Sequence, residues 1–367
     1  MTQEAELPGK RVLVLRPDEL GPNEQKMWRE IRTESGAPAN PFLDPAFTVA
    51  VGQVRPGARV AVLLDDGSSV GFFPYEVGVL GRGRAIGLGV SDSQGAVLRP
   101  GIRLDARRLL RVCGLSSWEF DNLEAGQEVF VSHAVEELAS PVVDIGEGFE
   151  AYTRRLRAQS AGFLRQTLAK ERKLVRQVGP VRFVYNARDP AALRALMQWK
   201  SAQYRRTGRR DPFAQEWITR LVGLLGKSEE PECRGVLSVL YAADRPVAAH
   251  FGLRSRTVLS WWFPAYDRAY AKYSPGLVLQ LRMLEAAAAD GVQTVDLGSG
   301  PARYKESLKT RDLRVYEGAV VRPVPGGAAH WLGREPARAA RRFVRNRPRL
   351  AGAAVRTLEE LGRLRGG

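Results

Sequence analysis

The segment from residue 234 to 305 limits the possible folds most, because its hydrophobic pattern changes period several times in a definite order. Runs of β-branched and aromatic residues between short polar turns predict three successive strands, at 235–242, 246–254 and 257–263. The pattern then predicts a helix, a strand and a helical turn, at 275–289, 293–297 and 302–309. A sheet whose later strands alternate with helices is therefore expected, which indicates a mixed α/β fold.

The flanking residues extend this order at both ends. A strand is predicted at 181–186 and a final strand at 314–322. Two helices precede the three-strand segment, at 189–204 and 213–226. The first begins at Asp189-Pro190, where a proline in the first turn leaves no hydrogen bond unmade. The second half of the chain thus has the order β-α-α-β-β-β-α-β-α-β.

The first half repeats this order with a weaker signal. Its predicted strands lie at 11–16, 59–66, 69–80, 84–90, 117–123 and 142–145. Its predicted helices lie at 22–35, 41–54 and 105–112. The dipeptide Asp66-Gly67 favours a tight hairpin turn between two of the strands. The two halves therefore indicate one fold present twice, with diverged sequences.

A long amphipathic helix is predicted between the halves. One apolar stripe is formed by Phe149, Tyr152, Leu156, Phe163, Leu168 and Val175. Arg and Lys occupy its other faces, and Gly179-Pro180 ends it. We expect this helix to connect the two halves.

The net charge of +16 is concentrated in two segments. Residues 154–182 hold nine Lys or Arg and one acid, and residues 330–367 hold ten Arg and three acids. Such concentration suggests a local anionic partner, such as a nucleotide-linked substrate, the phosphates of CoA, tRNA or a lipid surface. Two solvated helix faces would also explain the pattern, so both interpretations stay open.

Composition excludes or disfavours several other classes. No apolar run reaches the roughly 18 residues of a membrane span, and the N-terminus lacks the apolar centre of a signal peptide. Cys113 and Cys233 provide neither a disulfide framework nor metal-ligand spacing. A cytoplasmic protein without a metal is expected, and the basic segment at 330–367 would permit association with a membrane surface.

The second half carries a resemblance to a known family. Its motifs are Ala248-Ala249-His250, Tyr266-Asp267, Ser274-Pro275-Gly276, Gly291, Asp296-Leu297-Gly298 and Tyr304-Lys305. Together with the strand order, they resemble the GNAT acyltransferase fold, and within it the CelD/BcsL-type acetyltransferases. That family is related to the Fem-type transferases, which carry two GNAT-like domains in tandem. The chain departs from the usual GNAT pattern at 268–276, where the glycine spacing of the CoA pyrophosphate loop is absent.

This resemblance implies an organisation in four parts. The N-terminal part, 1–147, would be a degenerate GNAT-like domain, and 148–180 would be the connecting basic helix. The C-terminal domain, 181–325, would be the acyltransferase, followed by an Arg-rich helical tail at 326–367. The fold expected is therefore a pair of tandem GNAT-like domains with mixed sheets.

Three residues are candidates for the chemistry of acyl transfer. His250 shares a strand face with the small residues Ala248 and Gly252, and a neutral imidazole can take a proton from an attacking amine. The resemblance implies that Tyr304 protonates the leaving thiolate, and Lys305 could hold a phosphate or the developing oxyanion. A core histidine, an aromatic anchor and a surface lysine are the alternatives.

Four residues are candidates for holding acetyl-CoA. Ser274 and Gly276 flank a proline where a helix begins, and the free N–H groups at a helix N-terminus bind phosphate. Arg268 and Lys272 lie just upstream and add positive charge. A plain capping serine explains the same residues without a ligand.

Four more residues are candidates for contact with the acceptor. Asp296 ends a strand beside a glycine turn, and the carboxyl ends of strands open into crevices where ligands bind. Asp267 lies in a predicted loop, and Asp92 lies in a polar loop of the first half. Trp262 could stack on a sugar ring, although packing explains it equally well. Capping and ordinary turns are the alternatives for the acids.

The leading hypothesis is an N-acyltransferase that moves acetyl from acetyl-CoA to an amine. The acceptor implied by the resemblance is an amino sugar, or an amine linked to a polysaccharide or natural product. A Fem-like transferase that uses aminoacyl-tRNA is the first alternative, because it would account for the missing CoA loop and the basic segments. A non-catalytic protein that binds an anionic polymer or a membrane surface is the second.

Overall fold

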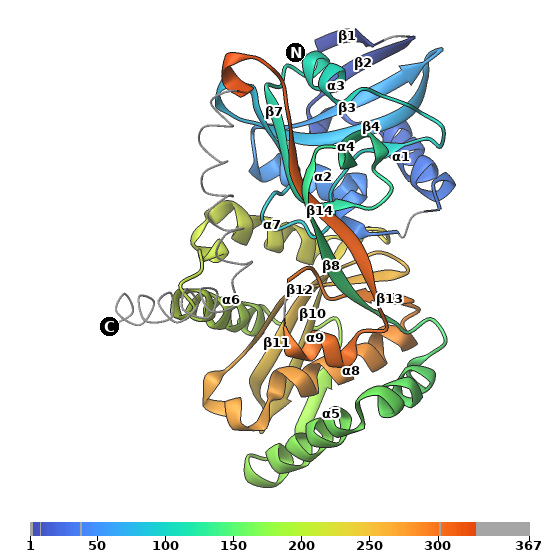
Figure 1. Cartoon of the computed structure of the whole chain (residues 1–367). Helices are drawn as coiled ribbons and strands as arrows, with labels where there is room; N and C mark the ends of the chain where they lie inside the picture. The colour runs from blue at the N-terminus through green and yellow to red at the C-terminus, as the bar shows by residue number, and fades with distance from the viewer. Residues whose placement is uncertain (1–2, 8, 37–38, 301, 328–367) are drawn as a thin grey trace.

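The computed structural model describes residues 3–7, 9–36, 39–300 and 302–327. One mixed sheet of 14 strands runs through both halves, in the order β1-β2-β3-β4-β5-β7-β14-β8-β13-β12-β11-β10-β9, with β6 beside β4. The first half lies at the top of Figure 1 and the second at the bottom. The expectation of a mixed α/β fold is confirmed.

The two halves have the same order of elements. The first contains β1 (Gln3–Leu7), β2 (Lys10–Leu15), α1 (Pro22–Glu34), α2 (Pro45–Val54), β3 (Ala58–Asp65), β4 (Ser68–Val77), β5 (Arg82–Ala85), β6 (Val97–Leu98), α3 (Ala106–Val112), β7 (Ser117–Glu124), α4 (Glu128–Val131) and β8 (Ala134–Asp144). The second contains β9 (Val181–Val184), α6 (Pro190–Arg206), α7 (Glu216–Lys227), β10 (Arg234–Ala242), β11 (Arg245–Arg254), β12 (Val258–Tyr266), α8 (Pro275–Ala289), β13 (Thr294–Asp296), α9 (Arg303–Leu308) and β14 (Arg311–Val321). From β2 to β8 and from β9 to β14, both follow β-α-α-β-β-β-α-β-α-β once the two-residue β6 is set aside.

The last strand of each half pairs with the penultimate strand of the other half. β8 lies antiparallel to β13, and β14 lies antiparallel to β7. β8 and β14 also pair with each other along most of their length, and Figure 1 shows them crossing the middle of the molecule. This exchange joins the halves through continuous backbone hydrogen bonds. The proposed division at residues 147 and 148 stays a prediction.

Helices cover both faces of the sheet in each half. In the second half, α6 and α7 pack on one face, and α5 (Phe149–Gln177), α8 and α9 pack on the other. In the first half, α1 packs on one face of the sheet, and α3 and α4 pack on the opposite face. No helix of the described residues is long and apolar enough to cross a membrane.

The stripe predicted for the long helix is correct only in its first part. Tyr152 and Leu156 are buried, but Leu168 and Val175 are 37% and 45% exposed. Leu164, Thr167 and Leu174 are buried instead. The backbone of Ser160 leaves the helical region, at φ −145° and ψ 47°, which rotates the buried face of the following turns. A periodicity counted through this residue therefore follows the wrong face.

Two first-half elements also differ from the prediction. The strand expected at 84–90 ends at Ala85, because Gly87 and Gly89 adopt positive φ angles of 64° and 87° and turn the chain. The final strand is not 142–145 but the much longer β8, which begins at Ala134. Its first part, residues 134–139, alternates between half-buried and exposed residues and includes the adjacent Glu136 and Glu137, and pairing with β14 compensates for the weak hydrophobic signal.

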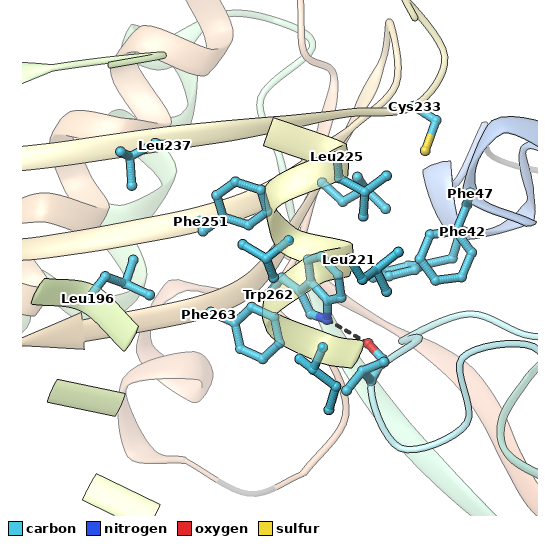
Figure 2. Close-up of a cluster of buried hydrophobic side chains, with 14 of the residues drawn as sticks. Phe42, Phe47, Leu196, Leu221, Leu225, Cys233, Leu237, Phe251, Trp262 and Phe263 are labelled. Atoms are coloured by element: carbon cyan, nitrogen blue, oxygen red, sulfur yellow. Dashed lines mark hydrogen bonds between the residues drawn. The ribbon is translucent and has the colours of Figure 1, made fainter. Parts of the chain in front are cut away.

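Aromatic and aliphatic side chains from both halves share one core. Phe42 and Phe47 come from the first half, and they pack with residues of α7, β11 and β12 (Figure 2). Trp262 lies at the centre of this cluster, with its ring 5.4 Å from that of Phe42. Its indole N–H donates to the carbonyl of Val90, as Figure 2 shows. Packing is therefore the role that the structure shows for Trp262.

We expect Trp262→Phe to lower the free energy of unfolding by roughly 2 kcal/mol, because it removes this hydrogen bond and part of the packing. Chemical denaturation measures the change. Trp199→Phe, in the partly buried face of α6, is the control. An equal loss in both variants would contradict a special role of Trp262 in joining the halves.

Candidate active site

Two parallel strands part in the middle of the second half. β12 and β13 are paired only from Val258 opposite Thr294 to Ser260 opposite Asp296. Beyond Ser260, no strand of the described residues pairs with β12 on this side. Along this edge the backbone of β12 from Trp261 onward therefore lacks a strand partner in the described chain and can pair with a ligand, except at Pro264, whose carbonyl accepts from Lys200.

The equivalent opening in the first half is filled by the chain itself. β5 and β7 form the matching parallel pair, from Arg82 opposite Ser117. Beyond that pair, Gln94 donates its N–H to the carbonyl of Asn122 and accepts from the N–H of Glu124. The Gln94 side-chain nitrogen also lies 2.6 Å from a carboxylate oxygen of Asp121. Within the described residues, the gap beyond the parallel pair is therefore bridged in the first half and left without a strand in the second.

Carboxylates from both halves meet where β12 and β13 part. Asp296 is 3% exposed and accepts from the Ser140 hydroxyl and the Gly298 N–H, both at 2.9 Å. Asp92, from the loop after β5, accepts from the Ser260 hydroxyl at 3.3 Å. The predicted candidates Asp92 and Asp296 are thus brought together, although 204 positions separate them in the sequence.

The surroundings disfavour negative charge on both groups. Loss of hydration raises the pKa of Asp92 to about 7, and the neighbouring Asp296 contributes to the rise. Burial also raises the pKa of Asp296. A carboxyl group with a pKa near 7 can accept and release protons under physiological conditions.

Lys305 provides the positive charge nearest to this pair. Its ammonium group donates to the carbonyls of Gly298 and Ser299, at 2.9 and 3.1 Å, and approaches that of Gly300. Burial lowers the pKa of Lys305, while Asp92 and Asp296 act in the opposite direction. Lys305 is only 8% exposed, so the surface lysine considered as an alternative is excluded. Its direct role is to hold the turn after β13.

His250 lies inside the sheet and is fully buried. Its ring stacks on Trp261, with the centroids 3.9 Å apart, and neither ring nitrogen makes a hydrogen bond of ordinary geometry among the described residues. Burial, together with the charge of Lys200, lowers the pKa of His250 to about 3. The imidazole is therefore neutral, but it is enclosed, and its part in proton transfer stays a prediction.

Tyr304 lies at the start of α9, beside Trp261. It is partly buried against the core beneath α8, and burial raises the pKa of its phenol. A neutral phenol can donate a proton to a developing thiolate. The position of Tyr304, one residue before Lys305, places it near the opening between β12 and β13.

The residues expected to hold CoA lie together at the start of α8. Arg268 and Lys272 are exposed on the short 3-10 segment Arg268–Tyr273, and Asp267 caps that segment through the N–H of Ala269. Ser274 does not act as the plain cap considered above. Its side chain makes no capping hydrogen bond, and its backbone is left-handed, with φ 50°. Gly276 follows in the first turn of α8.

The sequence interpretation missed Lys200 on α6. This lysine is 8% exposed, and its ammonium group donates to the carbonyl of Pro264 in β12 at 2.9 Å. Burial, with the charges of Arg209 and Lys305, lowers the pKa of Lys200 to about 8. The only available signal was the spacing, because Lys200 follows Ala192 and Leu196 at four-residue steps and so lies on the buried face of the helix.

A cavity of about 530 Å³ adjoins the two carboxylates. Its wall includes Asp92, Glu124 and Asp296, together with residues from α1, β6, α4 and β14. Loss of hydration raises the pKa of Glu124 to about 7, and its carboxylate accepts a hydrogen bond from Ser93. No cluster of three or more His, Cys, Asp or Glu within the described ranges could hold a metal ion.

One protein-family model matches part of the chain. Residues 162–306 match the family model described as "Acetyltransferase (GNAT) domain". This range contains the parallel strands that part, the start of α8 and Lys305. No curated protein shows a significant match to the chain.

Three solved structures are similar over most of their length. A tandem GNAT protein from the clavulanic acid biosynthesis pathway has 12% identity and a TM-score of 0.49, over 85% of this chain and 98% of that one. The C-terminal domain (DUF2156) of a protein from Agrobacterium fabrum has 13% identity and a TM-score of 0.49, over 84% and 94%. FemX has 9% identity and a TM-score of 0.47, over 71% and 87%.

The chain is an acyltransferase with an acetyltransferase (GNAT) domain at residues 162–306.

Proposed function

We propose that the protein transfers acetyl from acetyl-CoA to an amine, on an amino sugar or on a polysaccharide-related or natural-product acceptor. The observation that carries this proposal is the free edge of β12, which opens beside Asp92 and Asp296 at the point where β12 and β13 part. An extended donor can bind along that edge while a proton acceptor stands at its inner end. The CelD/BcsL type remains the family branch that the motifs resemble.

The start of α8 is the proposed binding site for the donor phosphates. The hydroxyl of Ser274 makes no capping hydrogen bond and can therefore bind a ligand. The first turn of a helix also favours negative charge. Arg268 and Lys272 are exposed beside it. These residues fit an anionic ligand, although they lack the glycine spacing of the usual loop.

Asp92 is the proposed base. An amine in water is largely protonated at neutral pH, so the ammonium must first lose one proton, which the Asp92 carboxylate accepts. The neutral nitrogen then attacks the thioester carbon, the C–N bond forms and the C–S bond breaks. Tyr304 supplies a proton to the thiolate and recovers one, through solvent, when the nitrogen loses its second proton, and Asp92 returns its own proton to solvent. The products are an amide, the free thiol and one released proton.

Tyr304→Phe is expected to lower kcat by roughly 10² while leaving the melting temperature nearly unchanged, because only the proton donor is lost. His250→Ala should lower turnover by a similar factor if the imidazole takes part in proton transfer. Steady-state kinetics with a thermal melt for each variant measure both effects. Rates near wild type in both variants would remove these two residues from the mechanism.

The first test of the function is the melting temperature of the full chain with and without acetyl-CoA. Binding to the native state alone raises it, so we expect a rise that saturates with acetyl-CoA. Arg268→Ala and Lys272→Ala should reduce that rise, whereas Arg245→Ala, at the exposed start of β11, should not. No rise with any acyl-CoA would contradict the proposed donor.

One observation favours a second candidate, transfer from aminoacyl-tRNA. The basic helix α5 contacts the donor segment directly, since the ammonium group of Lys170 donates to the carbonyl of Lys272 at 2.8 Å. An anionic partner bound to 154–182 would therefore lie beside the start of α8. RNA binding that weakens steeply with salt, without any response to acyl-CoA, would support this candidate. The other basic segment, 330–367, lies outside the described residues.

A further inference from the structure

We propose that the cavity beside Asp92 is the acceptor site, and that it takes a protonated amine carried on an apolar body. This inference rests on the proposed acyl transfer and, among the acceptors named above, favours a natural-product amine over an amino sugar. It is argued from the position of the cavity, the chemistry of its wall and the pairing of its charged groups.

The cavity lies on the face of the sheet opposite α8. Leu259 and Val295 pack into the core with α8 and α5. Side chains alternate along a strand, so Val258, Thr294 and Asp296 point to the other face, and all three line the cavity. A donor held at the start of α8 and an acceptor in the cavity would thus approach the parting point of β12 and β13 from different sides.

Asp92 connects the cavity to that point. It lines the cavity and also accepts from Ser260, the last residue of β12 that is paired with β13. A methyl group placed on Gly298 would stand 3.4 Å from an Asp92 carboxylate oxygen, so this carboxylate is in contact with the turn after β13. An amine bound to Asp92 would therefore reach the free edge of β12.

The remaining wall is mostly apolar. Its apolar side chains include those of Leu43, Val97, Leu98, Ile102, Val129 and Leu313, and Asn40, Ser93, Gln127 and Glu128 also line it. At about 530 Å³, the cavity has the size of a small-molecule site. A sugar ring would place several hydroxyl groups against this wall, where unpaired polar groups cost free energy, whereas an alkyl or aromatic body would gain from burial.

The unpaired acidic side chains of the cavity wall favour a cationic ligand. Three of its arginines already have acidic partners: Arg32 pairs with Asp44, Arg99 with Glu34 and Arg311 with Asp144. Arg314 also lines the cavity and is exposed, with no ion pair among the described residues. Asp92 and Glu124 have no ion pair among the described residues, since their hydrogen bonds come from Ser260 and Ser93. An ammonium group would neutralise this end of the cavity.

Calorimetry on the full-length protein, without acyl donor, tests the inference with 2-phenylethylamine and glucosamine as probes. We expect 2-phenylethylamine to bind at least 10-fold more tightly, and Asp92→Asn to weaken its binding at least 10-fold. The uncharged analogue 2-phenylethanol should bind more weakly than the amine. Equal or tighter binding of glucosamine would overturn the proposal.

A matched pair of variants on α4 separates a cavity effect from a folding effect. Val129 and Val131 are both partly buried against the same core, but only Val129 lines the cavity. Val129→Ser should weaken 2-phenylethylamine binding about 5-fold, and Val131→Ser should leave it unchanged. Equal effects would overturn the assignment. An amine that binds as expected but is never acetylated would instead refute the proposed transfer and leave the amine site standing.

Discussion

Asp92→Asn is expected to lower kcat/KM by roughly 10² or more and to remove its dependence on pH near 7. In the wild type, only the carboxylate accepts the proton from the amine, so the rate should rise with pH through the pKa of Asp92, which is about 7. The amide keeps the shape and the hydrogen bond from Ser260 but cannot act as a base. A pH–rate profile of both proteins measures the effect.

The same substitution should make the protein more stable at pH 8. The pKa of Asp92 is about 7 in the folded state, against 3.8 for an aspartate without these neighbours, as in the unfolded state. Between these values the folded state holds a proton that the unfolded state has released, so this group reduces stability as pH rises through that window. Asparagine avoids the loss, and we expect a gain of roughly 2 kcal/mol at pH 8 and almost none below pH 4.

Denaturation at pH 4 and pH 8 distinguishes this result from a general effect of lost charge. Asp244→Asn, in the exposed turn between β10 and β11, is the control and should change neither stability nor rate. A destabilised Asp92→Asn protein at pH 8, or one with the wild-type pH–rate profile, would refute the proposed role of Asp92.

Lys305→Met is expected to lower the free energy of unfolding by roughly 3 kcal/mol and kcat by roughly 10². Methionine retains the apolar stem but loses the donors to the carbonyls of Gly298 and Ser299 and leaves Asp296 without its nearest positive charge. Because Lys305 also lowers the pKa of Asp92, loss of the lysine charge should raise that pKa and move the rising limb of the pH–rate profile above pH 7.

The control for this prediction lies directly after the same helix. Lys309 follows α9 and pairs with Glu306 and Asp312 at the surface, so Lys309→Met should leave the melting temperature and the pH profile almost unchanged. Thermal melts and pH–rate profiles of the two variants, compared with the wild type, measure the difference. An unshifted profile in Lys305→Met would show that this lysine does not act on Asp92.

Much of the second half follows from local signals. Asp189 caps α6 through the N–H groups of Ala191 and Ala192, as Asp-Pro at a helix start predicts. Gly291 has φ 81° directly after α8, the conformation that glycine adopts at the end of a helix. In the first half, the turn at Asp66-Gly67, with φ 46° and 79°, was likewise visible in two residues. Such features depend on neighbours in the chain, so a single sequence contains them.

The candidate site is less visible, because it depends on contacts between distant residues. Asp296 and Lys305 could be proposed from a strand end and a short helix. The pairing of Asp92 with Ser260 across 168 positions could not, since nothing near Asp92 distinguishes it from an ordinary loop acid. Lys200 was missed because a buried lysine contradicts its usual preference, and only the packing of α6 on β11 and β12 encloses it.

Local chemistry thus set the order of strands and helices, the turns and most of the caps, since each of these is decided within a few residues. The exchange of β8 and β14 between the halves was decided by long-range pairing, in which backbone hydrogen bonds carry no sequence signature. The same pairing decided which parallel strands stay open, because Gln94 fills one gap and nothing in the described chain fills the other. The charge of Asp92 depends on that assembly, since its pKa is raised only by the side chains that the fold gathers around it.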